Sequence, residues 1–540
     1  MHSAPASRFF NHIPHRRTVI VSFRDQIWIA LCFALIWAFF AIPILRSPLG
    51  SYPVVDAAWH SAWATEIAGG NLSIYAPYFR APLYPAVLGL VYLLSGCSEI
   101  SGILLSFALC TAALLVVYRI VFHIHRSRRK ALAAAAITGI NGVFLFYSTT
   151  LLIAPLYILL LLCSFYLFQK DSKSKYGWFF LGLAAVARPA AVLLFPLAIV
   201  LYRRSWKYCW QLLLPLSGVW LVNATTGDPW TVISSQGGIN FYIGSGPEAD
   251  GYTSFAPETG GLTQLPDSLP YRDNVWAASI RPFPRAMEPS RVSSEWIGRT
   301  LDYIKENPGS FAFLMAKKLL YAASPVAIPS NYDVYYYTRY SPLAGLVEGT
   351  PGFPVAGLLI WLLVPGALAA GPLKSGERNA LLWASVLCLG VLPFFITARF
   401  LLPVLPFVVI LLGPRFLSRP IRSLALAPLG LALGLGIARL TEHTVESGGV
   451  NMAFHDGLAH YRLGLVEESE MLLLQSLDVA FERNDGIDLN GTDALFNLGI
   501  IALRRGDPDE AETYWRMALE RNPDFVPAIQ ALQGLTHWNE

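Results

Sequence analysis

The sequence has few charged residues for its length. Lys, Arg, Asp and Glu make up 14% of its 540 residues, whereas they make up about 25% of an ordinary soluble domain. The formal net charge is only +4, and the basic residues gather in short loops instead of along one face. These features exclude an ordinary soluble domain and do not support nucleic-acid binding.

Cysteine is scarce as well, and its spacing indicates no metal. The six cysteines lie in or beside apolar runs, with no Cys-x-x-Cys pair among them. The loops 47–100 and 224–350, which we expect on the outer side, contain no Asp-x-Asp pair of the kind that holds a cation. We therefore expect no disulfide framework, no metal site and no cofactor.

Long apolar runs, by contrast, are abundant. A membrane-spanning helix needs about 20 apolar residues, and we count roughly eleven candidate spans on that basis. We therefore predict an all-α polytopic membrane protein. The candidate runs lie near residues 25–45, 101–122, 131–147, 150–168, 176–188, 189–202, 207–223, 353–371, 379–397, 400–416 and 422–440.

Two of these runs are too short for two ordinary spans. They meet at "AVARPAAV", where Arg188 and Pro189 interrupt the apolar sequence. Such an interruption indicates either a tight hairpin or a broken helix that lines a cavity, because irregular backbone is not stable against lipid. The sequence leaves both alternatives open.

Short basic loops predict the topology. The loops near 123–130, 169–175, 202–207, 372–378 and 414–422 are rich in Lys and Arg, which favours the cytoplasmic side. The basic segment 1–24 should also be cytoplasmic, with the first apolar run as an uncleaved anchor. This arrangement requires 82–96 to form an interfacial or re-entrant helix. It places the loops 47–100 and 224–350, and everything after about 441, on the outer side.

The C-terminal segment has a repeat signature. In "ALFNLGIIALRRGDPDEAETYWRMALERNPD", the apolar and small residues occupy the positions of the 34-residue tetratricopeptide pattern; they are Leu495, Leu498, Gly499, Ala502, Ala511, Trp515, Ala518 and Pro523. A weaker copy upstream places Gly457, Ser469 and Ser476 correspondingly. We predict a small α-solenoid over 450–540. Two units are fewer than an independent solenoid needs, so the module should rest on the membrane domain or a protein partner.

Several motifs of the membrane part occur in an order that is typical of one family of membrane enzymes. They are "VVDAAWHSAWATEIAGG", "FRAPLYPAVLGLVYLLSG", "GWFFLGLAAVARPAAVLLFPLAIVLY", "SSQGGINFYIGSGPEADG" and "TARFLLPVLPFVVILL". Over about residues 25–440 the sequence thereby resembles the GT-C superfamily of membrane glycosyltransferases, in particular the dolichyl-phosphate-mannose protein mannosyltransferase and aminoarabinose transferase type. Some bacterial members of that type also carry tetratricopeptide tails.

The resemblance implies a fold and a reaction. The fold would be a GT-C bundle in the bacterial cytoplasmic (inner) membrane, with its active site on the outer, periplasmic face. The reaction would transfer a sugar from a polyprenyl-phosphate-linked donor to a protein, lipid or glycan acceptor. Enzymes of this type use an acid in the first outer loop as the base, and Asp56 occupies that position.

The residue types suggest further candidates. Guanidinium groups bind phosphate with two parallel hydrogen bonds and stay charged, so Arg80, Arg188 and Arg399 are candidates for binding the lipid phosphate. His60 and Tyr84 are candidate contacts of the acceptor or the sugar. Simpler roles compete with these: Asp56 is also suited to cap the helix that follows it, and arginines near membrane boundaries also fix topology.

One departure from the family pattern bears on mechanism. Family members commonly carry another acid at the outer turn before the span near residue 150, whereas this turn reads "YSTTLLIAPLY". The sequence therefore predicts one carboxylate instead of two, or a differently specialised site. Other functions stay open at this point: a related polysaccharide polymerase or ligase, a membrane transporter, or a tetratricopeptide scaffold of an envelope assembly without catalytic activity.

Overall fold

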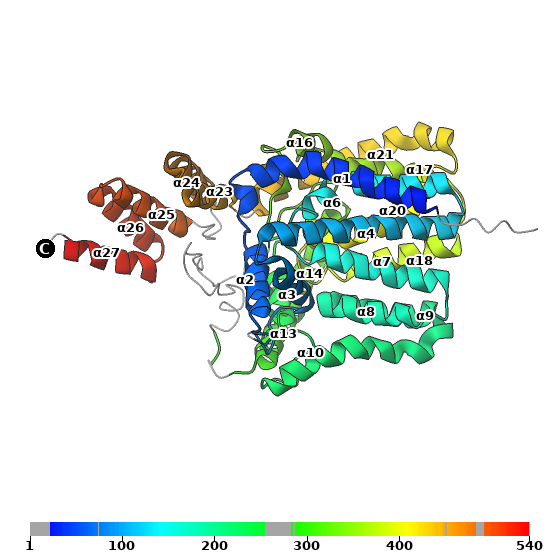
Figure 1. The fold of residues 1–540 in the computed structure, drawn as a ribbon, viewed down its shortest axis with the longest axis horizontal. Helices are drawn as coiled ribbons and strands as arrows, with labels where there is room; N and C mark the ends of the chain where they lie inside the picture. The colour runs from blue at the N-terminus through cyan, green and yellow to red at the C-terminus, as the bar shows by residue number, and fades with distance from the viewer. Residues whose placement is uncertain are drawn as a thin grey trace, which may run out of the picture.

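The computed structural model describes residues 22–73, 75–253, 282–284, 287–448, 451–481 and 491–538. The predicted cytoplasmic segment 1–24 therefore lies almost wholly outside the described residues. Helices dominate, as predicted, and strands occur in the described part only as the two-residue pair β1 (Gly349–Thr350) and β2 (Phe353–Pro354). Figure 1 shows a bundle of roughly parallel helices, a layer of shorter helices across one end of it, and a separate group of helices beyond that layer.

Four helical stretches are long and apolar enough to cross a membrane. They are α1 (Phe23–Arg46), α4 (Glu99–His125), the α19–α20 stretch (Ala398–Phe416) and α21 (Pro420–Thr441). Five apolar helical stretches are shorter: α3 (Leu83–Ser95), α7 (Ala154–Lys170), α8 (Tyr176–Ala187), η2–α9 (Pro189–Leu201) and α17 (Val355–Leu368). The number of about eleven spans stays a prediction.

Other expected runs are divided in the structure. The run near 131–147 forms α5 (Arg128–Gly139) and α6 (Gly142–Tyr147), because Asn141 caps α6 by accepting from the Phe144 N–H. The run near 207–223 begins in the 3₁₀ segment η3 (Arg203–Leu212) and continues as α10 (Leu213–Thr225). The helix α18 (Ser375–Leu389) ends before the predicted end of its run.

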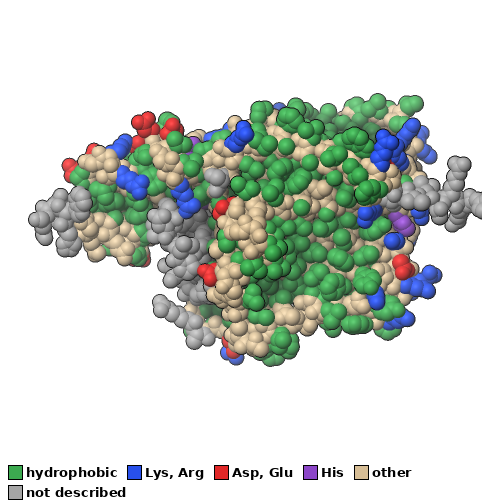
Figure 2. Space-filling model, in the orientation of Figure 1, with side chains coloured by type: hydrophobic (Ala, Val, Ile, Leu, Met, Phe, Trp, Pro, Cys, Tyr) green, Lys and Arg blue, Asp and Glu red, His purple; other side chains and the backbone are tan. Residues whose placement is uncertain are grey.

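The surface of the bundle has the pattern of a membrane protein. In Figure 2, hydrophobic side chains cover the middle of the visible face, while Lys and Arg side chains gather at the end farthest from the C-terminal helices. Lipid-facing helices expose large apolar side chains that a soluble protein would bury, such as Phe39 and Leu104. The interior is packed with aromatic residues, and the largest fully buried ones include Trp63, Trp178 and Trp383.

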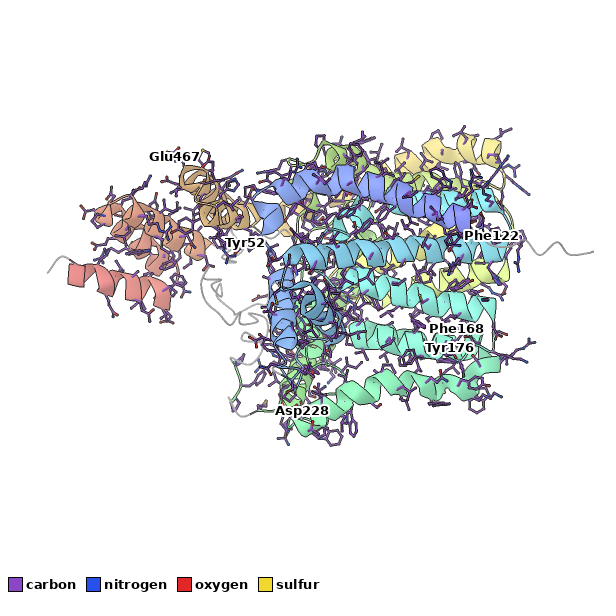
Figure 3. The ribbon with its side chains drawn as sticks, in the orientation of Figure 1. Tyr52, Phe122, Phe168, Tyr176, Asp228 and Glu467 are labelled. Atoms are coloured by element: carbon purple, nitrogen blue, oxygen red, sulfur yellow. The ribbon has the colours of Figure 1, made fainter. Side chains whose placement is uncertain are left out.

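The interruption at Arg188 is a tight hairpin. The helix α8 ends at Ala187, Arg188 adopts an extended backbone, and the chain continues through η2 (Pro189–Leu193) and α9 (Leu194–Leu201). The two ends of this unit meet again, because the Trp178 indole N–H donates to the Ser205 carbonyl at 3.1 Å. Figure 3 places Tyr176, at the start of α8, at the end of the bundle opposite to Tyr52. Arg188 therefore lies at the turn, toward the end that carries Tyr52.

Short helices cover that end of the bundle, which we call the outer cap because the basic loops predict that it lies on the outer side. Two of them, α2 (Asp56–Ala68) and α3, cross closely because Gly89 lacks the Cβ that would meet Ile67 and the Ala64 carbonyl. The region 82–96, predicted to be interfacial or re-entrant, is thus a 13-residue helix within the cap. The remaining cap helices are α11 (Gly237–Ser245), α13 (Pro289–Glu306), α14 (Pro308–Ala323), α15 (Val334–Tyr337) and α16 (Pro342–Glu348).

The C-terminal helices form antiparallel pairs with a core of their own. After α22 (His443–Gly448) come α23 (Met452–Arg462) with α24 (Val466–Phe481), then α25 (Gly491–Arg504) with α26 (Pro508–Arg521), and finally α27 (Val526–Trp538). Gly499 lets α25 approach α26 closely, because a Cβ there would lie 2.3 Å from the Trp515 ring nitrogen. We call residues 451–538 the tetratricopeptide module.

The tetratricopeptide module rests on the outer cap, as two contacts show. Asp456 accepts hydrogen bonds from the hydroxyls of Tyr336, at 2.9 Å, and of Tyr340. The Arg462 guanidinium lies 4.6 Å from the ring centre of Tyr52, and Tyr52 marks the boundary between the two parts in Figure 3.

Candidate functional site

Asp56 is the first residue of α2 and is buried in the outer cap. Its carboxylate does not cap the helix: the N-cap is Val55, and the helix has no side-chain cap. The carboxylate faces two arginines from distant parts of the chain. Oδ1 accepts from Arg80 Nη1 at 2.7 Å, and Oδ2 accepts from Arg399 Nη1. The structure thus brings three of the predicted site residues into direct contact.

Different elements present these two arginines. Arg80 lies in the segment that links α2 to α3, and its guanidinium stands 5.3 Å from the ring centre of Trp59. Arg399 lies in the first turn of the α19–α20 stretch, directly after the extended residue Thr397. Both arginine side chains are largely buried, with relative exposures of 12% and 13%. In such surroundings, charge-assisted hydrogen bonds are stronger than in water.

Arg188 joins this group from the α8–α9 hairpin. Its guanidinium lies 4.0 Å from the ring centre of Phe400 and 5.8 Å from that of Tyr157. Arg399 contacts the same Phe400 ring at 4.9 Å. Arg188 is also close enough to interact electrostatically with Asp56 and Arg399. The aromatic ring therefore stabilises two cations that would otherwise repel each other.

Three guanidinium groups, from Arg80, Arg188 and Arg399, converge on the single carboxylate of Asp56. Two of them donate to it directly, and Arg188 interacts with it electrostatically. Burial tends to raise the pKa of Asp56, but Arg80 and Arg399 hold that pKa well below its usual range. Asp56 is thus fully ionised, and the guanidinium groups gathered around it are of the type that binds anions such as phosphate.

His60 lies one turn after Asp56 on α2. It is buried, and its Nδ1 lies 3.1 Å from the Leu151 carbonyl oxygen. Burial lowers its pKa to about 4, although Asp56 acts in the opposite direction. His60 is therefore neutral near pH 7. A carbonyl can only accept, so Nδ1 carries the proton and Nε2 is left as a bare acceptor, with no hydrogen-bond partner in the described part of the chain.

Tyr84, the other proposed contact residue, packs beside His60. It is fully buried near the start of α3, and its ring stands edge-on to the imidazole with 5.1 Å between the ring centres. No contact of Tyr84 with the arginines is seen. The structure therefore places Tyr84 behind His60, one layer away from the charged cluster.

The turn at 148–153, where family members commonly carry a second acid, has only hydroxyl and apolar side chains. The hydroxyls of Ser148, Thr149 and Thr150 donate to backbone carbonyls of the preceding turn. The Thr150 carbonyl in turn accepts from Ser106 of α4. This turn is closed by its own hydrogen bonds, and its Leu151 carbonyl contacts His60.

A second buried carboxyl group lies elsewhere in the outer cap, and the sequence did not single it out. Glu348 at the end of α16 is fully buried, and its two oxygens have no hydrogen-bond partner among the described residues. Burial, with a smaller effect of Asp333, raises the pKa of Glu348 to about 8. Glu348 fits against Gly142, where a Cβ would lie 2.3 Å from its Oε2. No sequence signal distinguishes this glutamate from a surface residue.

Metal binding finds no geometric support in the described residues. They contain no group of three His, Cys, Asp or Glu side chains placed to hold a metal ion. Asp250, in the segment that follows α11, accepts from the backbone N–H groups of Tyr252 and Thr253 and so closes a turn beside Gly251.

Comparisons with known proteins bear on the two parts of the chain separately. A family model described as tetratricopeptide repeat matches residues 456–524. No curated protein matches the chain. The match confirms the tetratricopeptide signature over these residues, and the bounds 450–540 of the α-solenoid stay a prediction.

Three solved structures are similar to the chain. ArnT from Cupriavidus metallidurans in the apo state has a TM-score of 0.44 at 12% identity, over 94% of this chain and 77% of that one. The same enzyme bound to undecaprenyl phosphate gives 0.39 at 16% identity, over 95% and 77%. The apo oligosaccharyltransferase of Archaeoglobus fulgidus gives 0.38 at 12% identity, over 87% and 59%.

Proposed function

We propose that this chain transfers a sugar from a polyprenyl-phosphate-linked donor to an acceptor at the outer cap. The observation that carries the proposal is the convergence of three guanidinium groups, from Arg80, Arg188 and Arg399, on the carboxylate of Asp56. Guanidinium groups bind phosphate oxygens through charge-assisted hydrogen bonds, so a phosphate diester suits a site where three of them meet.

The positions of the arginines suit a phosphate that is attached to a lipid chain. Arg188 lies at the turn between two apolar helical stretches, and Arg399 lies at the start of a stretch long enough to span the bilayer. A phosphate bound between them would have its polyprenyl chain beside apolar helices and its sugar toward the outer cap. The donor would therefore come from the bilayer and the acceptor from outside.

Asp56 would act as the base, and donor binding would activate it. With both arginines bound to it, Asp56 has a strongly lowered pKa and would be a weak base. A donor phosphate competes for the same guanidinium groups, so binding would release Asp56 from part of this attraction and raise its pKa. The free enzyme would thus hold its base in an inactive, paired form.

The reaction then balances without a cofactor. The acceptor oxygen or nitrogen attacks the anomeric carbon, while the bond between that carbon and the phosphate oxygen breaks. The acceptor proton moves to Asp56, and polyprenyl phosphate leaves with its additional negative charge. Arg80, Arg188 and Arg399 would stabilise this developing charge, which is the kind of interaction that lowers a barrier. His60 would contact the sugar or the acceptor through its bare Nε2.

Localisation and partners follow from the same proposal. The clustered basic loops favour a cytoplasmic location for the end of the bundle opposite to the outer cap. The site and the tetratricopeptide module would then face the periplasm from the inner membrane. The module would bind a protein partner, since tetratricopeptide repeats present extended binding surfaces.

Asp56→Asn tests the proposal. Asn keeps the size of the side chain but cannot accept a proton, and loss of a general base costs typically 10² to 10⁴ in rate. We expect sugar transfer from a polyprenyl-phosphate donor to fall by that factor in membranes that carry the variant, while the bound donor is retained. Asp302→Asn, an exposed aspartate of α13, is the matched control.

The same measurement separates the enzyme from a transporter or scaffold. If Asp56 were only a structural ion-pair partner, Asp56→Asn would lower stability without a selective loss of turnover. Near-normal transfer by folded Asp56→Asn protein would remove Asp56 from the mechanism.

A further inference from the structure

Lys318 is a buried lysine that no part of the proposed reaction uses. It lies on α14 and is fully buried. Its ammonium group donates to three backbone carbonyls: that of Leu392 at 2.8 Å, and those of Gly244 and Phe394. Burial of a lysine is costly unless hydrogen bonds satisfy its three N–H groups. Here three carbonyl oxygens do so.

Two of these carbonyls belong to the segment 390–397, which we call the Arg399 loop. The Arg399 loop connects the end of α18 to the α19–α20 stretch, in which Arg399 is the second residue. Near its end the loop is pinned by backbone hydrogen bonds, from the Ile396 N–H to the Gly251 carbonyl and from the Ala398 N–H to the Ile328 carbonyl. Lys318 fixes its middle.

The third carbonyl links the Arg399 loop to α11. Gly244 and Ser245 of α11 approach the loop so closely that a Cβ on Gly244 would lie 2.4 Å from the Phe394 backbone. The Ser245 hydroxyl donates to the Pro393 carbonyl at 2.7 Å. Lys318 thus sits where α14, α11 and the loop meet, and it holds all three together.

The chemistry of the amine suits this role. A carbonyl oxygen only accepts, so three adjacent carbonyls repel one another unless a multiple donor lies between them. Burial lowers the pKa of Lys318 to about 7, with Asp250 acting in the opposite direction. The charged form donates three hydrogen bonds and so matches the three carbonyls.

We propose that Lys318 is a positioning residue for the phosphate site. By binding the Leu392 and Phe394 carbonyls, it fixes the position of the Arg399 loop, so that Arg399 reaches both Asp56 and the donor phosphate. This inference rests on the proposed function. Lys318 touches neither Asp56 nor the arginines, and it acts only through the loop. A displacement of about 1 Å at a binding group is enough to weaken a bidentate contact strongly.

The test measures binding of undecaprenyl phosphate to the purified full-length protein. Lys318→Met keeps the apolar stem but removes every N–H donor. We expect it to raise the dissociation constant roughly 3- to 30-fold, the range typical of residues that act through a network. Lys317→Met is the matched control, because its side chain is partly exposed beside Phe313, and it should leave binding unchanged.

A double-mutant cycle distinguishes positioning from general damage. If Lys318 acts through Arg399, then Lys318→Met should have no further effect on binding in an Arg399→Ala background. Gly244→Ala places a Cβ against the Phe394 backbone of the same loop. It should weaken binding like Lys318→Met, and it should have no further effect in the Arg399→Ala background. Each variant is compared at a temperature where circular dichroism shows it folded.

The outcomes separate the inference from the proposed function. The positioning role alone is overturned if folded Lys318→Met binds undecaprenyl phosphate like the wild type. It is also overturned if Lys318→Met raises the dissociation constant by the same factor with Arg399 and with Ala at that position. Failure of the wild-type protein to bind the probe, or unchanged binding in Arg399→Ala, overturns the phosphate site and with it this inference.

Discussion

At the scale of single residues, Arg188 gives the most direct test of anion binding. Replacing it with Ala removes one cation of the cluster, and hydrogen bonds to charged groups contribute about 1.5–3 kcal/mol, or roughly 10- to 100-fold in affinity. We expect Arg188→Ala to weaken undecaprenyl phosphate binding by that factor. Arg188→Lys should recover only part, because an ammonium is a point charge and lacks the planar group that contacts Phe400.

The control for this measurement lies at the other end of the same hairpin. Arg203 follows α9 and is exposed, so Arg203→Ala should leave binding unchanged. Equal binding by wild type, Arg188→Ala and Arg188→Lys would show that the donor phosphate does not contact the hairpin.

Glu348 predicts an unusual dependence of stability on pH. Its folded-state pKa is raised to about 8 from an ordinary value of 4.5, so the folded protein keeps a proton that the unfolded chain releases. This stabilising contribution is complete below pH 4.5 and is lost as pH rises through about 8. We expect the Tm in detergent to fall over this range, and Glu348→Gln, which stays neutral, to reduce the fall.

Glu99→Gln is the matched control for that experiment, since Glu99 is exposed at the start of α4. If Glu348→Gln and wild type lose Tm in parallel between pH 5 and 8, Glu348 is ionised in the folded protein. The idea of a protonated buried carboxyl would then be wrong.

The sequence could indicate some of these residues but not others. Asp56, Arg80 and Arg399 stood out because a charge beside an apolar run is expensive and needs a reason. Phe400, Glu348 and Lys318 did not stand out, since an aromatic residue, a glutamate and a lysine are ordinary in cap segments. Their roles depend on partners far away in the sequence, and only the fold brings those partners together.

At the scale of elements, the contact between α23 and the outer cap can be tested. Asp456→Ala removes the acceptor shared by the Tyr336 and Tyr340 hydroxyls. We expect faster hydrogen exchange of the α23 backbone and of the 334–340 segment, because both lose an anchoring contact. The core around Trp515 should stay protected, since it belongs to the α25–α26 pair.

Asp509→Ala, on the exposed first turn of α26, is the control and should change neither region. Unchanged exchange at α23 in Asp456→Ala would mean that apolar contacts alone hold the tetratricopeptide module on the outer cap.

Elements were predictable where a local pattern determines them. The tetratricopeptide pairs follow from small residues at fixed spacing, and Gly499 and Trp515 pack as that spacing requires. The break at Arg188 was also clear, but its geometry was not. Whether a Pro-containing break reverses the chain or only bends it depends on distant packing, here on the Trp178 contact with Ser205.

At the scale of the whole molecule, the prediction is the orientation in the membrane. Single cysteines at Asn71, Glu295 and Asp509 should react with an impermeant reagent added from outside, whereas Arg129, Lys173 and Arg204 should be protected. All six positions are exposed, so accessibility does not limit the reaction. A background with Cys97→Ser is needed, because Cys97 is itself exposed.

Reaction at Arg129 together with protection at Asp509 would reverse the arrangement and place the tetratricopeptide module in the cytoplasm. The number of spans was the least predictable property at this scale. Runs of similar hydrophobicity became long helices, short helices or split helices, because Asn141 and other capping residues interrupt them. Hydropathy measures composition and does not register such caps.

The contact of Arg462 with Tyr52 has a kinetic consequence. Tyr52 precedes Asp56 by four residues, so a partner bound to the tetratricopeptide module would already lie close to the charged cluster. Tethering of this kind turns an encounter in solution into a local one, with effective concentrations in the millimolar range for short flexible connections. An acceptor held by the module would then be modified at a rate that hardly depends on its bulk concentration, while a free acceptor of the same chemistry would need to be supplied at millimolar levels.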